Sequence, residues 1–572
     1  MTLLAISGFK GELPRINALA LPVEFAQVAL NAKVTSGVLQ PIRGVKPVHT
    51  FTEPMQTAYL NGADWLGWAS FVDVVPAPVA ANRLYVTGDG SPKMIDGVTE
   101  YELAVPSPAT APSVALASTA DPNALQSIYF AYTYVSGFGE ESQPSPLSAI
   151  LDWSEGVIVN ISGMVPAPSG RNLTRIRIYR SQTSATGATG LFFVDEISGA
   201  STTYAYNSVT TPSLQELIPS TDYDQPPDDL TGITSLPNGM MAAFVGKDLY
   251  FSEPYQPHAW PEKYVLTVDF EIVGLAAFGS TIAILTRGTP YVAQGTHPDN
   301  FVMEKMEANL PCMSRRGIVD IGYAAVYPSA DGLVVISASE ANLMTRAMFS
   351  REQWAAMAPE SFTAANYDGL YMFTHTMGDY DVVTSGVQGI NPFPADYIIG
   401  GTPESTAPTG RSYDFGSPFT AFGEQRVGSI DVSGQTPYFL PFSIVQPRAM
   451  ITDIRSGDLF ILESDGLVVS RWDDKDQGAQ NLVWRSKKNR LPHTGMFSVI
   501  MVRTQDQTLT DDLVVVEVFA DGRKIHTSNR ANVPERMRSG IRSHDWEIEI
   551  NSNVPVVSIK MAGSIEELMG AP

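Results

Sequence analysis

The chain has 572 residues and a formal net charge of −23, from 37 Lys and Arg against 60 Asp and Glu. Hydrophobic residues make up 44% and aromatic residues 10%, so intrinsic disorder is excluded. An acidic chain is also a poor candidate for a protein that binds duplex DNA tightly, because binding to phosphates requires clustered Lys and Arg. The single cysteine, Cys312, excludes an intrachain disulfide framework and a cysteine-rich zinc site. At roughly 150 residues per domain, the length predicts three or four domains.

The start of the chain shows no basic region followed by a long apolar run, so no secretory signal is visible. The most apolar stretch, residues 272–285, is too short and too rich in Gly and Ser to cross a bilayer. We therefore expect a soluble protein without a membrane span, made in a reducing cytoplasm.

Residues 1–50 predict an N-terminal arm with one helix. The helix is expected at residues 21–33, because Pro22 suits a first helical turn and apolar side chains then share one face. Extended, proline-containing segments lie on both sides, and residues 38–48 are expected to pack across a domain or subunit boundary. Residues 51–105 predict a β segment that packs on the body.

Residues 106–220 predict an immunoglobulin- or fibronectin-like sandwich. A linker rich in Pro, Ala and Ser precedes six or so short alternating strands that are separated by turns. The cysteine pair of antibody domains is absent. Four arginines fit either a phosphate patch or a solvated strand face: Arg171, Arg175, Arg177 and Arg180.

Residues 221–470 predict a degenerate β-propeller. Five segments share a small or apolar run, a turn with Gly, Ser or Asp, and a hydrophobic strand; recurrence every ~35–50 residues is typical of propeller blades. One helix interrupts the repeat, because Ser350 and Gln353 have the spacing of a capping box and Pro359 ends the helix. The expected strands begin at residues 249, 282, 333, 370 and 459.

Residues 471–572 predict a C-terminal β domain. Four apolar runs are typical of strands, residues 520–522 form a turn, and Ser564 with Glu567 opens a short terminal helix. The whole sequence therefore predicts an all-β, multidomain fold with few short helices, which combines a degenerate propeller with a sandwich and a C-terminal β domain.

The negative charge is unevenly distributed: residues 471–572 hold 14 basic and 14 acidic residues, so all of the net charge lies in residues 1–470. The densest acidic run contains paired prolines and lacks the pattern of a calcium loop, so a solvated linker is the plainer interpretation. Its acids are Asp222, Asp224, Asp228 and Asp229. The densest basic run predicts either a solvated turn or a surface that docks an acidic neighbour: Trp484, Arg485, Lys487, Lys488 and Arg490.

Motifs for catalysis and for cofactors are absent from the sequence, including the nucleophile elbow, the Walker loop, the Rossmann fingerprint and His-Glu-x-x-His. No two of the seven histidines lie within four residues of each other, so nothing predicts a histidine metal site. Cys312 lies near two arginines that would lower its pKa, but a lone cysteine is more often a small packing residue. We expect no enzyme activity, no cofactor and no metal, although sixty acids leave a glycosidase-like pair of carboxylates open.

Three separated strings carry a family resemblance. The first runs from Phe9-Lys-Gly-Glu-Leu-Pro-Arg-Ile to Pro41-Ile-Arg, the second is Leu249-Tyr-Phe-Ser-Glu-Pro-Tyr-Gln-Pro-His-Ala-Trp260-Pro, and the third begins Arg538-Ser-Gly-Ile-Arg-Ser-His-Asp-Trp546. Together they resemble the tail nozzle proteins of short-tailed bacteriophages, also called tail tubular protein B. Residues 106–215 lie outside the resemblance.

The resemblance implies a structural protein of the virion: a homo-oligomeric ring, usually a hexamer, at the distal end of the tail. Such a ring would hang below an adaptor ring, help hold the tail fibres, and form the channel through which DNA leaves without specific binding. It would assemble in the host cytoplasm. A DNA conduit should be acidic inside, because attractive contacts with phosphates would arrest a moving duplex. The four acids of the linker are the candidate lumen residues.

Two other classes of function stay open on the sequence. A virion-associated propeller glycosidase or depolymerase would place two carboxylates about 5–9 Å apart in a deep pocket. An adhesin would bind host glycans through a shallow patch lined by aromatic residues. A nozzle subunit would show neither feature, and would have a large subunit interface.

Overall fold

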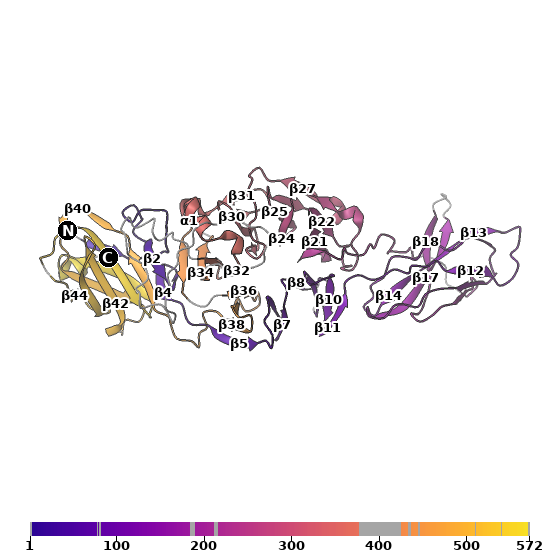
Figure 1. The fold of residues 1–572 in the computed structure, drawn as a ribbon, viewed down its shortest axis with the longest axis horizontal. Helices are drawn as coiled ribbons and strands as arrows, with labels where there is room; N and C mark the ends of the chain where they lie inside the picture. Colours follow the sequence, from indigo (N-terminus) through magenta and orange to yellow (C-terminus); the bar gives the residue numbers. More distant parts are fainter. Residues whose placement is uncertain are drawn as a thin grey trace, which may run out of the picture. The chain divides into compact units, whose positions relative to one another are not determined.

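The computed structural model describes residues 3–76, 78, 80, 82–183, 189–210, 216–376, 425–432, 436–443, 447–508, 511–538 and 540–569. The chain divides into two compact units: unit 1 is residues 1–69 with 307–572, and unit 2 is residues 70–306. Strands dominate both units (Figure 1), and the described residues contain two short α-helices. The all-β, multidomain fold class is therefore confirmed.

Unit 1 contains a terminal domain of two six-stranded antiparallel sheets, built from both ends of the chain (Figure 1). In the first sheet, β1 (Leu3–Ile6), β4 (Val38–Pro41) and β41 (Val499–Thr504) all pair with β46 (Val556–Ala562). The other strands of that sheet are β3 (Ala32–Thr35) and β44 (Glu535–Arg536). The second sheet contains β2 (Ala26–Leu30), β39 (Leu482–Ser486), β40 (Asn489–Gly495), β42 (Asp511–Ala520), β43 (Arg523–Arg530) and β45 (Ser543–Ser552).

The helix that the sequence predicts at residues 21–33 is wrong. Strands β2 and β3 occupy this stretch, and Asn31 between them has a φ of 54°. Asn enters this left-handed conformation more readily than most residues, so the chain can turn from one sheet into the other. Burial of Phe25 and Ala29, together with the pairing of β2 with β39, outweighs the helical pattern of the sequence.

The rest of unit 1 contains, within its described residues, three four-stranded antiparallel sheets of the kind found in propeller blades. The third sheet is completed by β5, so the N-terminal arm leaves the terminal domain after β4 and enters a blade. The three sheets comprise β28 (Val319–Asp320), β29 (Ala325–Ser329), β30 (Gly332–Ile336), β31 (Ala341–Leu343); β32 (Ala364–Tyr367), β33 (Leu370–Thr376), β34 (Gln425–Asp431), β35 (Phe439–Phe442); and β36 (Pro447–Thr452), β37 (Leu459–Glu463), β38 (Val468–Arg471), β5 (Lys46–Thr50). A separate hairpin joins β6 (Thr57–Asn61) to β7 (Asp64–Trp68).

Unit 2 also contains, in its described part, three four-stranded sheets of this kind. Strands run in chain order across each sheet, which is the meander of a propeller blade. The sheets comprise β8 (Asp73–Pro76), β9 (Arg83–Thr87), β10 (Lys93–Asp96), β11 (Thr99–Glu102); β20 (Thr231–Ser235), β21 (Met241–Val245), β22 (Asp248–Phe251), β23 (Leu266–Thr267); and β24 (Ile272–Phe278), β25 (Thr281–Thr286), β26 (Tyr291–Gln294), β27 (Val302–Lys305).

The repeat seen in the sequence corresponds to these blade sheets. The strand starts expected at 249, 282, 333, 370 and 459 fall in β22, β25, β30, β33 and β37. Sheets of the same type also occur outside residues 221–470, at β8–β11 and through β5, whereas residues 377–424 lie outside the described residues. Propeller-type repeats are therefore confirmed.

The helices are short and their caps were visible in the sequence. Ser350 and Gln353 form the expected capping box of α1 (Arg351–Ala356), and Ser564 accepts a hydrogen bond from the Glu567 amide in α3 (Ile565–Met569). Single 3-10 turns lie at η1 (Pro237–Gly239), η2 (Glu262–Tyr264), η3 (Pro298–Asn300), η4 (Thr345–Ala347) and η5 (Pro359–Ser361). No helix in the described part of the chain is long and apolar enough to span a membrane.

The sandwich is inserted in unit 2 between β11 and β20. Two three-stranded sheets enclose a core that includes Phe130, Trp153 and Ile178. One sheet contains β12 (Ser113–Leu116), β16 (Val159–Ser162) and β19 (Tyr204–Tyr206), the other β14 (Phe130–Ser136), β17 (Leu173–Thr183) and β18 (Thr189–Ser198). A further pair joins β13 (Gln126–Ile128) to β15 (Leu151–Trp153).

One edge of β14 is covered by a segment with a serine at every third position. The amides of Ser142, Ser145 and Ser148 donate to the carbonyls of Tyr134, Tyr132 and Phe130. The three serine hydroxyls accept hydrogen bonds from the amides of the same three strand residues, at 2.9–3.1 Å. The segment thus satisfies the edge without being a strand itself, and the two prolines between the serines suit its extended conformation.

The pairing of the chain ends can be tested at Leu39 of β4, which is fully buried in the core of unit 1. We expect Leu39→Ala to lower the free energy of unfolding by about 2–5 kcal/mol, because it leaves a cavity where the N-terminal arm meets the terminal domain. Urea unfolding followed by tryptophan fluorescence measures the change. Val48→Ala, at a 41% exposed position, serves as the control. Equal midpoints for the two variants would contradict the structural role of the arm.

Candidate functional site

Two of the four acids in the linker between the sandwich and β20 are tied into the fold. The Asp224 carboxylate accepts hydrogen bonds from the Gln143 side chain at 2.5 Å and from the Glu262 amide at 3.0 Å. Asp222 forms an exposed ion pair with Lys263 at 2.9 Å. The expectation that this linker presents its carboxylates free of packing is therefore wrong for Asp224, because the linker is bonded to the elements on both sides of it.

The other two acids, Asp228 and Asp229, are exposed. No ion pair joins either of them to a cation within the described residues of unit 2. They precede β20 and lie next to a pocket of about 480 Å³, which is lined by Gln225, Pro227, Tyr250, Trp260, Glu262 and Val265.

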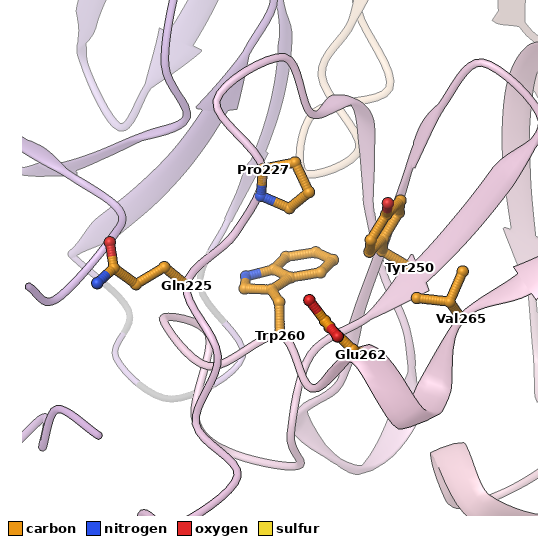
Figure 2. Close-up of a pocket in the computed structure, with 6 residues that line it drawn as sticks. All are labelled: Gln225, Pro227, Tyr250, Trp260, Glu262 and Val265. Carbon is orange, nitrogen blue, oxygen red and sulfur yellow. The ribbon is translucent and has the colours of Figure 1, made fainter. Parts of the chain in front are cut away.

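The pocket has an aromatic floor and an acidic rim. Figure 2 shows the Trp260 ring between Pro227 and Glu262, with Tyr250 and Val265 on one side. The indole N–H of Trp260 donates to the Pro257 carbonyl at 2.8 Å, so the polar edge of the ring is satisfied inside the fold. Trp260 is 1% exposed, whereas Glu262 is exposed at the rim.

The electrostatic field in the pocket is negative. Burial, and then the charges of Asp248, Asp229 and Glu262, raise the pKa of the Tyr250 phenol above its usual value. The nearest basic neighbour in sequence, Lys263, is already held by Asp222. The pocket is therefore suited to a positively charged group and unsuited to phosphate.

The expected docking surface at residues 484–490 is only partly available. Trp484 is wrong as a surface residue: it is fully buried, its N–H donates to the Lys10 carbonyl at 3.0 Å, and its ring meets Phe9 edge-on at 4.9 Å. The sequence misleads here because a buried tryptophan on β39 is followed directly by the basic residues of the strand end.

The two arginines of the basic run are paired with carboxylates of β45. Arg485 contacts Glu547 at 3.2 Å and lies over the Phe519 ring. Arg490 binds Asp545 through two hydrogen bonds of 2.8 and 2.7 Å, and it lowers the pKa of that carboxyl below its usual value.

The two lysines of the run, Lys487 and Lys488, connect β39 to β40. Their backbone is fixed, since the Lys487 carbonyl accepts from Ser486 and Asn489 and the Lys488 amide donates to Ala18. No ion pair engages either ammonium group in the part of unit 1 that the structure describes. Of the basic run, these two half-buried lysines are the cations that no ion pair engages within those described residues.

The four arginines of the sandwich form neither a phosphate patch nor a solvated face. Arg175 and Arg177 share the Glu196 carboxylate at 2.8 and 2.9 Å, and Arg177 also reaches Glu141 at 2.9 Å. The other two are buried: Arg180 donates to the Tyr206 hydroxyl, and Arg171 pairs with Glu140. Internal carboxylates thus pair with three of the four arginines, whereas Arg180 is held by a hydroxyl and lies over the Trp153 ring.

Sequence reasoning missed the buried polar junction between the sandwich and the blade sheets of unit 2. Arg171 and Glu140 form an ion pair at 2.8 Å with side chains 4% and 7% exposed, and Arg171 also donates to the Leu103 carbonyl at the end of the β8–β11 sheet. The adjacent Glu140-Glu141 acids were the available signal, but nothing in the sequence indicates which arginines they meet.

His258 lies in the second family-like string and bonds to the same junction. Its Nε2 lies 2.9 Å from the Glu141 carbonyl, so the neutral ring carries its proton on Nε2 and donates it. Burial lowers the pKa of the His258 imidazole below 6.5. The sandwich is thus fixed to the rest of unit 2 through Arg171, His258 and the Gln143–Asp224 bond, and does not hang on free linkers.

Metal and thiol chemistry find no support in the described residues. No group of three or more His, Cys, Asp or Glu side chains in that part of the chain could hold a metal ion. Cys312 is 1% exposed, and its thiol lies 3.5 Å from the Ser314 carbonyl, as expected for a packing residue.

The comparisons with known proteins give only distant likenesses. No protein-family model matches the chain, and no curated protein sequence matches it. Among solved structures, the N-terminal domain of Nup159 aligns over 51% of this chain and 88% of its own, with 9% identity and a TM-score of 0.23. PorZ, a surface component of the type-IX secretion system of Porphyromonas gingivalis, aligns over 90% of this chain and 77% of its own, with the same identity and TM-score. Similarity at this level carries no argument about function.

The junction can be tested by removing one charge of its ion pair. We expect Arg171→Met to lower the free energy of unfolding by about 3–5 kcal/mol, because it leaves the buried Glu140 carboxylate without its cation. The double variant R171M/E140M should recover most of this loss, since it removes both charges. Urea unfolding measures both. R287M, which breaks an exposed pair with Glu271 at 3.7 Å, is the matched control and should change little.

The junction should also weaken in acid through His258. The pKa of the His258 imidazole is lower in the folded protein than its unfolded value of 6.5. The stabilisation that the neutral His258 provides is therefore complete above pH 6.5, and it is lost as the pH falls below that value. We expect the thermal midpoint of the wild type to fall more between pH 7.5 and 5.5 than that of H258Q, whose amide can donate to Glu141 but cannot titrate. H493Q, at an exposed histidine, should behave as the wild type. Parallel curves for wild type and H258Q would refute this role.

Proposed function

We propose that this chain is the subunit of a tail nozzle of a short-tailed bacteriophage: a homo-oligomeric ring of six copies through which DNA leaves the particle. The position of the three family-like strings in the fold supports this proposal. Each string places one aromatic residue in a core, Phe9, Trp260 and Trp546, and none of the three is more than 1% exposed. The resemblance therefore rests on residues that determine packing, as befits a structural subunit.

The distribution of charge supports passage of DNA without specific binding. All of the net charge of −23 lies in residues 1–470, and three of the four sandwich arginines, Arg171, Arg175 and Arg177, pair with internal carboxylates. A ring of such chains repels a duplex instead of holding it. Of the four candidate lumen acids, Asp224 is an internal acceptor and Asp222 is paired, so Asp228 and Asp229 are the ones with unpaired exposed carboxylates among the described residues.

The partners proposed with this function are those of a ring at the tip of a tail. They are an adaptor ring above it, tail fibres beside it, and transiently the phage DNA. The ring would assemble in the host cytoplasm and reside in the virion. The sandwich lies outside the family-like strings and is the module that we assign to contact with fibres or the host surface.

The two other classes gain no support from the pocket. A glycosidase needs a pair of carboxylates, and Glu262 is the one carboxylate among the six residues that line the pocket. A glycan-binding adhesin stacks sugars on exposed aromatic faces, whereas Trp260 is 1% exposed.

Electron microscopy and native mass spectrometry of the purified full chain test the proposal. We expect rings with a central opening and a mass of six subunits, no retention of duplex DNA in a mobility-shift assay at low salt, and no cleavage of host polysaccharide. A protein that stays monomeric at every concentration, or that degrades polysaccharide, would contradict it.

A further inference from the structure

The pocket beside Trp260 combines the two features that recognise a basic side chain. Its walls come from the half-buried side chains of Pro227, Tyr250 and Val265, the buried Trp260 ring closes its floor, and Glu262 stands at its rim (Figure 2). Lys and Arg have apolar stems with a charged end, so the stem can lie along the walls while the cation meets the carboxylate. A volume of about 480 Å³ is ample for one such side chain.

The acidic side chains at the rim are not neutralised by ion pairs within the described part of unit 2. Glu262 is the one carboxylate among the six residues that line the pocket, and Asp229 follows the lining residue Pro227 by two positions in an exposed stretch. In the described part of unit 2, neither Asp229 nor Glu262 forms an ion pair, whereas the exposed acids Asp222 and Asp269 do. The rim therefore carries charge that a partner can neutralise.

The backbone of the rim is also held in place by hydrogen bonds. A fixed backbone favours a binding site over a flexible loop whose acids only face solvent. The Glu262 amide and the Trp260 amide donate to Asp224, through its carboxylate at 3.0 Å and its carbonyl at 2.8 Å. Asp224 is anchored in turn by Gln143 of the sandwich. A rigid rim loses little conformational entropy when it binds a partner.

A complementary group exists in the same chain. Lys487 and Lys488 are half-buried in the fixed connection between β39 and β40, and their neighbours Arg485 and Arg490 are paired with Glu547 and Asp545. They lie in the region of the chain that carries no net charge, whereas the pocket lies in the acidic region. This charge complementarity is the arrangement that a repeating head-to-tail contact requires.

We propose that the pocket of Tyr250, Trp260 and Glu262 receives a lysine side chain, Lys487 or Lys488, from a second copy of this chain. The inference rests on the proposed function, because it assigns a contact within the ring. In this assignment Asp229, named above as a candidate lumen residue, lies at the interface between subunits instead. The contact is heterologous, so each copy offers a pocket to one neighbour and lysines to the other, and a closed ring satisfies every site.

Charge reversal on each side of the contact tests this assignment in the full-length protein. We expect D229K/E262K and K487E/K488E each to raise the protein concentration at half-assembly by roughly ten-fold or more, because like charges then face each other. The chain that carries all four changes should assemble as the wild type does. Native mass spectrometry and analytical ultracentrifugation measure assembly, and a salt series should weaken the wild-type contact.

Matched variants control for charge and for folding. E304K and K475E reverse exposed residues of unit 2 and unit 1 and should assemble normally. Unchanged thermal midpoints show that the variants fold; if a reversal unfolds the chain, D229N/E262Q and K487Q/K488Q replace it with the same expected direction.

The outcomes separate this inference from the proposed function. Wild-type rings that tolerate both reversals, or that fail with one reversal and not with the other, would overturn the pocket–lysine contact and leave the nozzle standing. Failure of the four-fold variant to assemble when both parent variants fold would also overturn it. A wild-type chain that never assembles would overturn both.

Discussion

The fold of unit 1 depends on one constraint, which is that the two ends of the chain must meet. β1 pairs with β46 and β2 pairs with β39, and β5 then closes a blade against β38. These pairings join residues that are more than four hundred positions apart. The free-energy cost of closing so long a loop must therefore be offset by the burial of apolar side chains between the sheets. The fully buried residues Leu39, Trp484 and Trp546 lie where that recovery takes place.

In unit 2 the comparable constraint is electrostatic. Arg171 and Glu140 are taken out of water together, and the His258 imidazole must stay neutral beside them. Such a junction tolerates loss of neither partner, yet it fixes the sandwich in a defined position on the blade sheets. The same set of contacts reaches the pocket, because Gln143 anchors Asp224 and Asp224 holds the backbone of Glu262.

Features that depend on neighbouring residues could be predicted from the sequence, whereas features that depend on distant residues could not. The hairpins at 249, 282, 333, 370 and 459 and the capping box at Ser350 depend on neighbouring residues, and the structure confirms them. The false helix at residues 21–33 and the false surface position of Trp484 both arise from partners more than four hundred residues away. In the candidate site, the acids and lysines could be named from the sequence, but the aromatic floor at Trp260 and the engagement of Asp224 could not, because they depend on how distant segments pack.

The serine segment that covers β14 has a consequence for crowding. A strand with open amides and carbonyls can be extended by any second strand, and many copies held close together increase that risk. Ser142, Ser145 and Ser148 occupy both the donors and the acceptors of this edge, and their spacing of three cannot be continued by a regular strand. This edge of the sandwich is therefore closed to pairing with a neighbouring copy, even where many copies are held close together.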